Sequence, residues 1–348
     1  MLVRLIPGHL TSWKPWYYRA LIPALRRLGP EQSDAVLESL GRLVARSPYR
    51  ARRIAARLAD AREGLQADWD LDAARRALAG NLARFSARDC LLSGLSDEAA
   101  LSRFDVTGAE HLDTAIGSGS GLILLGSHFG AYLAAMHWLV RRRVPLRMML
   151  QRPHHVSDEL SRWFDLAGTL DDPNGLPRHP QSALFLRRAM PSGDGVLRVL
   201  RARSALVEGL AVLINGDVAW DSRCARPGRL LGRRVQIQSA WADLAVVTEV
   251  PVVPIFCSHR PAGRFAMTID PPWWIAPGSQ QDAVDHYLAR LDAMIANEPA
   301  EAISHLLWPT DDRPSIPGPA APRLRSTAPG IPSRTIEQTT SVRRLPGA

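Results

Sequence analysis

One histidine stands where a short apolar run meets an expected helix, and its surroundings suit acid–base chemistry. His128 follows the apolar run 121–126 and lies between Gly126 and Gly130. Such a run is typical of a buried strand in a parallel sheet, and open α/β sheets bind ligands at the carboxyl ends of their strands. Glycines beside the turn allow a ligand to approach the backbone closely. We therefore predict that His128 meets a substrate.

The expected helix after this turn bears on the protonation of His128. Partial positive charge at a helix N-terminus favours the uncharged imidazole, which can accept a proton. A neutral histidine suits general-base catalysis on a hydroxyl group. The backbone N–H groups from Ser127 to Gly130 are candidates for stabilising the developing oxyanion. The simpler alternative is that His128 only satisfies a hydrogen bond at the end of the strand.

Other motifs that would indicate different chemistry are absent from the sequence. The glycines at 117–121 precede their strand and lack the GxGxxG spacing of a dinucleotide site, and neither a Walker loop nor a G-x-S-x-G motif occurs. The adjacent His154 and His155 point apart in an extended chain, and no metal-ligand spacing is present. No CxxC pair occurs among the three cysteines, which are Cys90, Cys224 and Cys257. We expect no metal and no disulfide framework.

The elements around His128 predict an α/β fold with a largely parallel central sheet flanked by helices. Short apolar runs alternate with helical patterns from Gly121 onward. The expected strands are 121–126, 145–150, 210–216 and 251–257, with an edge strand at 263–270. The expected helices are 131–142, 157–167, 193–208 and 238–248, followed by a helical pair over 280–308.

Three regions differ in composition and residue spacing, and these differences predict the domain organisation. Residues 1–105 alternate arginine with Leu, Ala and Ile at helical spacing, which predicts a helical N-terminal region. Residues 106–310 form the expected α/β domain. Residues 311–348 are rich in Pro, Ser, Thr and Arg and contain few large apolar residues, so we expect a disordered tail.

The segment 13–28 is a candidate for contact with a membrane surface. It places Trp13, Trp16, Tyr17 and Tyr18 beside arginines and apolar residues, a combination that suits the headgroup boundary of a bilayer. The alternative is a helix docked on its own domain with exposed arginines. Because no apolar stretch approaches 18 residues and no signal-peptide core is present, we expect a protein inside the cell that touches a membrane peripherally.

The charge of the chain is carried almost entirely by arginine. The 348 residues include 43 Lys plus Arg against 34 Asp plus Glu, for a net charge of +9, and Lys14 is the single lysine. An excess of this kind suits a phosphate-bearing partner such as an anionic lipid or a phosphorylated substrate. No recognition helix or aromatic RNA-binding strand is evident, so we expect no nucleic-acid partner.

Several segments resemble the lysophospholipid acyltransferase superfamily, particularly its bacterial branch of lipid A biosynthesis lauroyl/myristoyl acyltransferases. The run 121–135 is similar to the first motif of that family, and further similarities follow in the expected order over residues 40–308. They are residues 151–153, residues 210–217 ending in Gly-Asp, Gly232 opening a helix before 251–256, and residues 297–308.

The resemblance implies transfer of a fatty acyl chain from a thioester of acyl carrier protein or coenzyme A to a hydroxyl of a lipid or glycolipid. His128 would be the general base, with no cofactor beyond the thioester, at the cytoplasmic face of the inner membrane. Ser127 and Gly130 would contact the substrate. Arginine binds phosphate through two parallel hydrogen bonds, so Arg152 is the first candidate for this role. A second candidate is the arginine cluster after Asp217, formed by Arg223, Arg226, Arg229, Arg233 and Arg234; its simpler interpretation is a solvated loop.

The sequence departs from that family at one important position. The family's histidine is followed by an acid in an H-x4-D/E pattern, but the corresponding residue here is Leu133. Three explanations remain open: another carboxylate reaches His128, with Asp217 the best candidate; the base works unaided; or the chain is a degenerate relative. The last explanation leads to an alternative function, a catalytically inactive acyltransferase-like protein that binds lipid.

Overall fold

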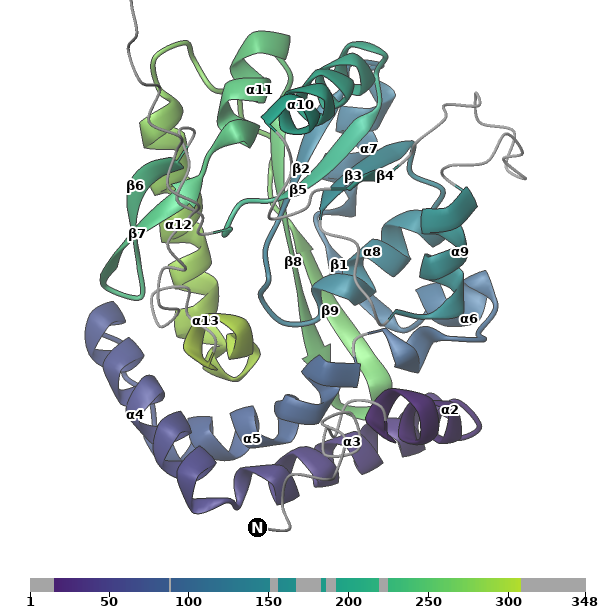
Figure 1. Ribbon diagram of the computed structural model, residues 1–348, viewed down its shortest axis with the longest axis vertical. Helices are drawn as coiled ribbons and strands as arrows, with labels where there is room; N and C mark the ends of the chain where they lie inside the picture. Colours follow the sequence, from purple (N-terminus) through teal and green to yellow (C-terminus); the bar gives the residue numbers. More distant parts are fainter. Residues whose placement is uncertain are drawn as a thin grey trace, which may run out of the picture. The chain divides into compact units, whose positions relative to one another are not determined.

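Figure 1 shows the computed structural model of the protein, and the elements described below belong to the unit Met1–Thr310. The described residues are 16–87, 89–150, 156–166, 183–185, 192–218 and 225–307. The tail that the sequence predicts to be disordered, 311–348, lies outside the described residues.

The core of the unit is a seven-stranded, mostly parallel sheet in the order β1-β9-β8-β2-β5-β3-β4, which confirms the predicted fold class. Strand β9 runs antiparallel to β8, and β1 pairs with β9 in parallel. The strands are β1 (Phe104–Thr107), β2 (Leu122–Gly126), β3 (Leu146–Leu150), β4 (Ala183–Phe185), β5 (Ala211–Asn215), β8 (Val252–Arg260) and β9 (Arg264–Ile269). The predicted strands are confirmed as β2, β3, β5, β8 and β9, whereas the sequence did not reveal β1 and β4.

Strand β2 lies in the middle of the sheet, and its side chains supply two separate cores. Leu122 and Leu124 pack into the first core, and Ile123 and Leu125 pack into the second. All residues of β2 are buried, as expected for a strand covered on both faces. In the register with β5, Gly126 lies opposite Asn215. The residues that follow these two strands therefore emerge side by side at one edge of the sheet.

Helices cover both faces of the sheet (Figure 1). The first core is covered by α2 (Ile22–Leu25), α3 (Pro30–Ala45), η3 (Cys90–Leu92), α6 (Asp97–Leu101), α7 (Ala109–Gly117), α8 (Tyr132–Arg141) and α9 (Asp158–Leu166). The second core is covered by α4 (Pro48–Leu65), α5 (Leu71–Ala87), α10 (Ser192–Val207), α11 (Ala240–Thr248), α12 (Gln280–Asn297), η5 (Pro299–Glu301) and α13 (Ile303–Leu307). Helices α8 to α13 confirm the helices predicted in the α/β region to within a few residues.

The N-terminal region is helical, as predicted, and it packs on the sheet. Helices α3 and α5 cross closely because Gly41 has no side chain: a Cβ there would lie 2.4 Å from the carbonyl oxygen of Ala79. Leu37 of α3 shares the first core with Phe265 of β9. The predicted boundary at residue 105 falls within β1, between this helical region and α7.

The start of the described chain docks on its own domain. In η2 (Tyr17–Leu21), the Tyr17 hydroxyl donates to the carbonyl of Ala83 at 2.8 Å. Ile22 and Leu25 of α2 are buried in the first core. Trp16, by contrast, is 67% exposed. The alternative interpretation of segment 13–28, a helix packed on its own domain, therefore describes most of its apolar side chains, while Trp13 lies outside the described residues.

A β-hairpin replaces the helix that was predicted to begin at Gly232. Strands β6 (Ala225–Leu230) and β7 (Arg233–Gln238) are antiparallel and joined by Leu231 and Gly232. Both turn residues have positive φ, at 54° and 75°, as two-residue hairpin turns require. The prediction was wrong because the alternation of Val235 and Ile237 with polar residues has the period of a strand.

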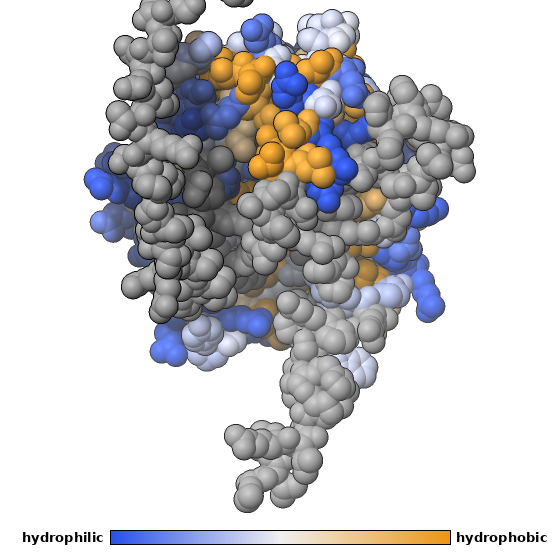
Figure 2. All heavy atoms as spheres, turned by 45° about the horizontal axis from the view of Figure 1, so that its top comes forward, coloured by the Kyte–Doolittle hydropathy of each residue, from blue (hydrophilic) through white to orange (hydrophobic). Residues whose placement is uncertain are grey.

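Apolar side chains gather on the surface at the end of the molecule that carries α10 and α11 (Figure 2). The exposed large apolar residues of these two helices are Val196, Leu197, Leu200, Val207 and Val247. The opposite side of α10, including Ala202 and Leu206, fills the second core. Within the described part of the chain, no helix combines the length and hydrophobicity needed to span a bilayer.

Candidate active site

The turn between β2 and α8 carries His128, and its two glycines are required by close packing. Gly130 has a φ of +54°, and a Cβ there would lie 2.2 Å from the carbonyl oxygen of Cys257. A Cβ at Gly126 would lie 2.7 Å from the side-chain oxygen of Asn215. A side chain at Gly130 would therefore displace the turn or β8, and one at Gly126 would displace the turn or Asn215 on β5.

His128 is held by a buried carboxylate that comes from the end of β5. Its Nδ1 lies 2.8 Å from Oδ1 of Asp217, and its backbone N–H donates to Oδ2 at 2.5 Å. Because an ionised carboxylate only accepts hydrogen bonds, Nδ1 carries the proton and the lone pair of the neutral ring is on Nε2. The Asp217 side chain is fully buried, whereas that of His128 is 36% exposed. The ring is thus fixed through Nδ1, while part of the side chain remains exposed to solvent.

The electrostatics of the site favour an ionised Asp217. Burial alone would raise the pKa of this carboxyl group, but the hydrogen bonds and charges of His128 and His305 outweigh burial and hold the pKa well below its usual range. Asp217 is therefore a permanent acceptor at neutral pH. It fixes the orientation and tautomer of His128 and can stabilise the imidazolium that forms when His128 takes up a proton.

A second histidine, which the sequence interpretation did not single out, contacts the same carboxylate. Nε2 of His305 lies 2.8 Å from Oδ2 of Asp217, and the side chain is only 6% exposed. His305 belongs to α13, where the neighbouring Ile303 and Leu306 are buried. It is 88 residues from Asp217 in the chain, and no spacing in the sequence connects the two.

The position of the missing family acid is filled by an ordinary core residue. Leu133 lies in α8, is 2% exposed and packs into the first core. The carboxylate beside His128 comes instead from Asp217, the residue that the sequence favoured for a partner from elsewhere in the fold. The two meet because β2 and β5 are adjacent and parallel, so that their carboxyl ends share one edge of the sheet.

The backbone N–H groups of the turn are already engaged, so the prediction that they stabilise an oxyanion was wrong for three of them. The N–H of His128 donates to Asp217, that of Phe129 to Oγ of Ser127 at 3.2 Å, and that of Gly130 to the carbonyl of Glu301 at 2.9 Å. These bonds build the turn. Ser127 is itself buried, and Gly130 is placed by its contact with Glu301.

A side-chain donor that the sequence interpretation missed lies closer to the reactive nitrogen. Nδ2 of Asn215 is 3.4 Å from Nε2 of His128. Asn215 is the last residue of β5 and is two residues before Asp217. The sequence signal was its place in Asn-Gly-Asp at a strand end, where polar residues reach the ligand-binding edge.

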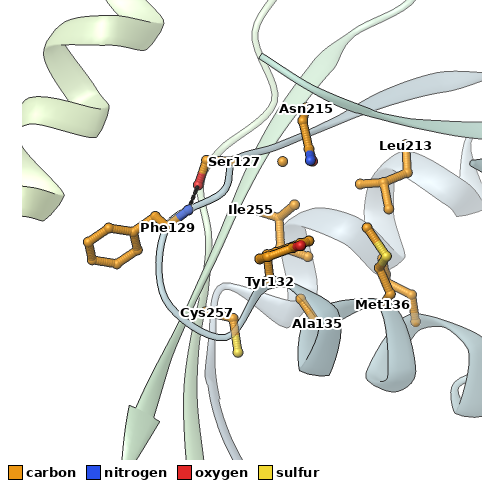
Figure 3. Close-up of a pocket in the computed structure, with 11 residues that line it drawn as sticks. Ser127, Phe129, Tyr132, Ala135, Met136, Leu213, Asn215, Ile255 and Cys257 are labelled. Atoms are coloured by element: carbon orange, nitrogen blue, oxygen red, sulfur yellow. Dashed lines mark hydrogen bonds between the residues drawn. The ribbon is translucent and has the colours of Figure 1, made fainter. Parts of the chain in front are cut away.

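A narrow, mainly apolar pocket lies beside the turn that carries His128 (Figure 3). Its lining residues are Gly126, Ser127, Phe129, Tyr132, Ala135, Met136, Leu139, Leu213, Asn215, Ile255 and Cys257. In Figure 3, Met136 and Leu213 lie toward one another, while the ring of Phe129 points away from them. The Tyr132 ring also contacts the His128 ring, with centroids 5.3 Å apart. Apolar groups thus surround the approach to a polar pair.

The predicted phosphate-binding arginines are only partly described. Arg152 and Arg223 lie outside the described residues. Arg229 is exposed on β6, donates to the carbonyl of Gly232 at 3.2 Å and lies opposite Arg234 across the hairpin. Two other members of the predicted cluster form ion pairs: Arg226 with Asp243 and Arg233 with Asp60.

Two further histidines pair with buried carboxylates away from His128. Nε2 of His137 lies 2.9 Å from Asp89, and Nδ1 of His259 lies 2.8 Å from Glu301. All four of these side chains are at most 5% exposed. The described residues contain no group of His, Cys, Asp and Glu that could hold a metal ion.

Comparison of the chain with protein-family models and with curated protein sequences gives no match.

Proposed function

We propose that this protein is an O-acyltransferase that moves a fatty acyl chain from a thioester to a hydroxyl of a lipid or glycolipid, with His128 as the general base. The observation that carries the proposal is the contact of His128 Nδ1 with the buried carboxylate of Asp217 at 2.8 Å. It orients a partly exposed imidazole whose Nε2 can accept a proton, next to an apolar pocket. A donor thioester of acyl carrier protein or coenzyme A supplies the activated acyl group.

The proposed reaction proceeds in two steps without a covalent enzyme intermediate. Nε2 of His128 takes the proton of the acceptor hydroxyl as its oxygen attacks the thioester carbonyl, which forms a carbon–oxygen bond and a tetrahedral oxyanion. The intermediate then collapses, the carbon–sulfur bond breaks, and the thiolate takes the proton back from His128. The products are the ester and the free thiol, and His128 returns to its starting state.

Asn215 is the best candidate among the described residues for stabilising the oxyanion. Its Nδ2 lies 3.4 Å from His128 Nε2, so a carbonyl carbon attacked by an oxygen at Nε2 would place its oxygen near the amide. Side-chain amides serve this purpose in other acyl-transfer sites, where a single donor contributes about 10²–10³ to the rate.

The apolar pocket suits the first part of the acyl chain. Its lining by Met136, Leu139 and Ile255 offers an environment in which methylene groups leave water at a gain of about 0.8 kcal/mol each. Because the pocket is narrow, a chain must displace side chains as it enters, and the unbranched Met136 can do this most easily. We expect Met136→Trp to impair long-chain donors more than short-chain donors.

The acceptor is proposed to be taken from a membrane surface at the cytoplasmic face of the inner membrane. The corner between α3 and α4 carries six arginines and no acidic residue over residues 40–59. Leu43 and Tyr49 at this corner are 59% and 67% exposed. Guanidinium groups next to an exposed aromatic ring suit the boundary of an anionic bilayer. Arg53 also donates to the carbonyl of Leu307 in α13, the helix that carries His305.

Vesicle flotation tests this surface. The variant Arg46→Glu/Arg50→Glu should lose binding to vesicles that contain phosphatidylglycerol, and the matched control Arg229→Glu/Arg234→Glu on the β6–β7 hairpin should retain it. Equal loss in both variants would show that net charge, and not this corner, governs binding.

The proposed reaction is tested by a screen of labelled acyl thioesters against a total lipid extract, read by mass spectrometry. The wild-type protein should form an acyl ester that is absent from reactions of the His128→Gln variant. An inactive lipid-binding protein, the alternative suggested by Leu133, would instead co-purify with lipid and form no ester with any donor. The hydrogen bond between Asp217 and His128 favours an enzyme over this alternative.

A further inference from the structure

We propose that His305 is a positioning residue that donates its Nε2–H to Asp217 and so keeps that carboxylate ionised and aligned for His128. This inference rests on the proposed function for its kinetic consequences, but its structural part can be measured without any substrate. No feature of the sequence links His305 to the site.

The hydrogen bonds to Asp217 divide into two sets. Oδ1 accepts from Nδ1 of His128, whereas Oδ2 accepts from the backbone N–H of His128 and from Nε2 of His305. Because the Asp217 side chain is fully buried, each donor offsets part of the cost of removing its charge from water. Without His305, every one of these donors would come from a single residue, His128.

The environment of His305 suits a residue whose role is its hydrogen bond to Asp217. Its Nδ1 is buried and has no hydrogen-bond partner among the described residues. An unpartnered buried nitrogen is costly, so a purely packing role would be served better by an apolar side chain at this position. The other nitrogen, which points at Asp217, is the one that is satisfied.

Other ionisable groups also face this part of the site. Asp292 of α12 is close enough for His305 to influence its pKa, which burial raises. The buried Tyr287 hydroxyl of α12 donates to the carbonyl of Gly126 at 2.7 Å. Arg53 of α4 contacts the carbonyl of Leu307 at the end of α13. Asp217 is the one among them that joins His305 directly to His128.

The consequence concerns the proton shared by His128 and Asp217. If the donor from His305 is removed, fewer hydrogen bonds stabilise the negative charge of the buried carboxylate. Protonation of His128, which places a positive charge next to Asp217, then becomes more favourable. His128 should then remain protonated to higher pH. The acidic limb of the pH profile of kcat/KM should consequently move upward, by about one pH unit.

Two variants separate positioning from packing. His305→Gln retains an N–H donor at a similar reach, and His305→Leu fills the space with apolar atoms but cannot donate. If His305 positions Asp217, His305→Gln should keep the wild-type acidic limb, while His305→Leu should shift it upward by about one unit and lower kcat/KM about tenfold or more. If His305 only packs, His305→Leu should be the better of the two variants.

A second readout keeps the test independent of turnover. Ring NMR of ¹⁵N-histidine-labelled protein should show that His128 takes up its proton at higher pH in His305→Leu than in His305→Gln or the wild type. Identical titration of His128 in all three proteins would overturn the inference even if acyl transfer is observed. A shifted titration without any acyl transfer would support the role of His305 and contradict the proposed function.

Discussion

One histidine–carboxylate pair lies at the turn before α8 and another lies within α8, and the difference between them shows what makes His128 a candidate base. His137 lies within α8, and its side chain and that of Asp89 are each 1% exposed. Arg141 donates to Nδ1 of His137 at 3.2 Å, so Nε2 carries the proton that it shares with Asp89 and Ser157. Both ring nitrogens of His137 are thus used inside the protein.

His128 contacts its carboxylate through Nδ1, while its Nε2 lies 3.4 Å from Nδ2 of Asn215. Its Nδ1 contacts Asp217, but its side chain remains 36% exposed and adjoins the apolar pocket. The pairs contain the same chemical groups, and what separates a catalytic from a structural interpretation is access to the second nitrogen. Matched substitutions in the two pairs should therefore give different results.

The largest expected effect is on catalysis by Asp217→Asn. The amide cannot accept from Nδ1 with the charge of a carboxylate and favours the wrong tautomer of His128, so kcat/KM for acyl transfer should fall by about 10⁴. Thermal unfolding of the purified variant checks that the protein is folded. Activity within tenfold of the wild type would remove Asp217 from the mechanism.

The corresponding change in the structural pair should affect stability. Asp89→Ala removes the buried partner of His137 and of the backbone N–H of Ser157, and we expect a loss of about 3–5 kcal/mol in the free energy of unfolding. Urea unfolding measures this loss. The folded fraction should transfer acyl groups at nearly the wild-type rate, and a selective loss of activity would place His137 in the site.

A smaller kinetic effect is expected for Asn215→Ala. Removing the amide next to Nε2 of His128 should lower kcat by about 10²–10³ and leave KM for the thioester nearly unchanged, because an oxyanion exists only in the transition state. Steady-state kinetics with the donor found in the screen provide the measurement. A rise in KM at constant kcat would assign Asn215 to ground-state binding.

The smallest expected effect is on the pH dependence of stability. For Asp89, burial would raise the pKa, but His137 and Ser157 outweigh it and lower the pKa. A carboxyl group with a depressed pKa stabilises the fold above its unfolded pKa of about 3.9 and loses this contribution as pH falls through its folded value. The free energy of unfolding should therefore decrease below about pH 4, and with a shallower slope in Asp89→Asn. Equal slopes would show that Asp89 contributes nothing to acid sensitivity.

The sequence predicted those parts of the fold and site that depend on local pattern. Apolar runs such as 121–126 identify strands because burial on both faces leaves only large apolar residues. The flanking glycines identified His128 as a candidate site residue. Asp217 was identified as its partner because ligands bind at the carboxyl ends of parallel strands. Strand β1, with the sequence FDVT and mixed burial, gives no comparable signal.

The role of His305 could not be predicted because tertiary packing alone brings this residue to the site. His305 lies on a five-residue helix at the end of the described chain, and its contact with Asp217 spans 88 residues. The hydrogen bonds of the N–H groups in the turn could not be predicted either, since the N–H of Gly130 donates to the carbonyl of Glu301, a residue that follows α12. The helix predicted to begin at Gly232 was wrong because a single glycine does not distinguish a hairpin turn from the start of a helix.

The tautomer of His128 at neutral pH is the most direct test of its role as a general base. Long-range ¹H–¹⁵N NMR of histidine-labelled protein distinguishes a ring protonated at Nδ1 from one protonated at Nε2 or at both nitrogens. We expect a neutral His128 with its proton on Nδ1, and loss of this preference in Asp217→Asn. A His128 that is protonated at Nε2 in the wild-type protein could not act as the base, and this result would contradict the proposed role of the residue.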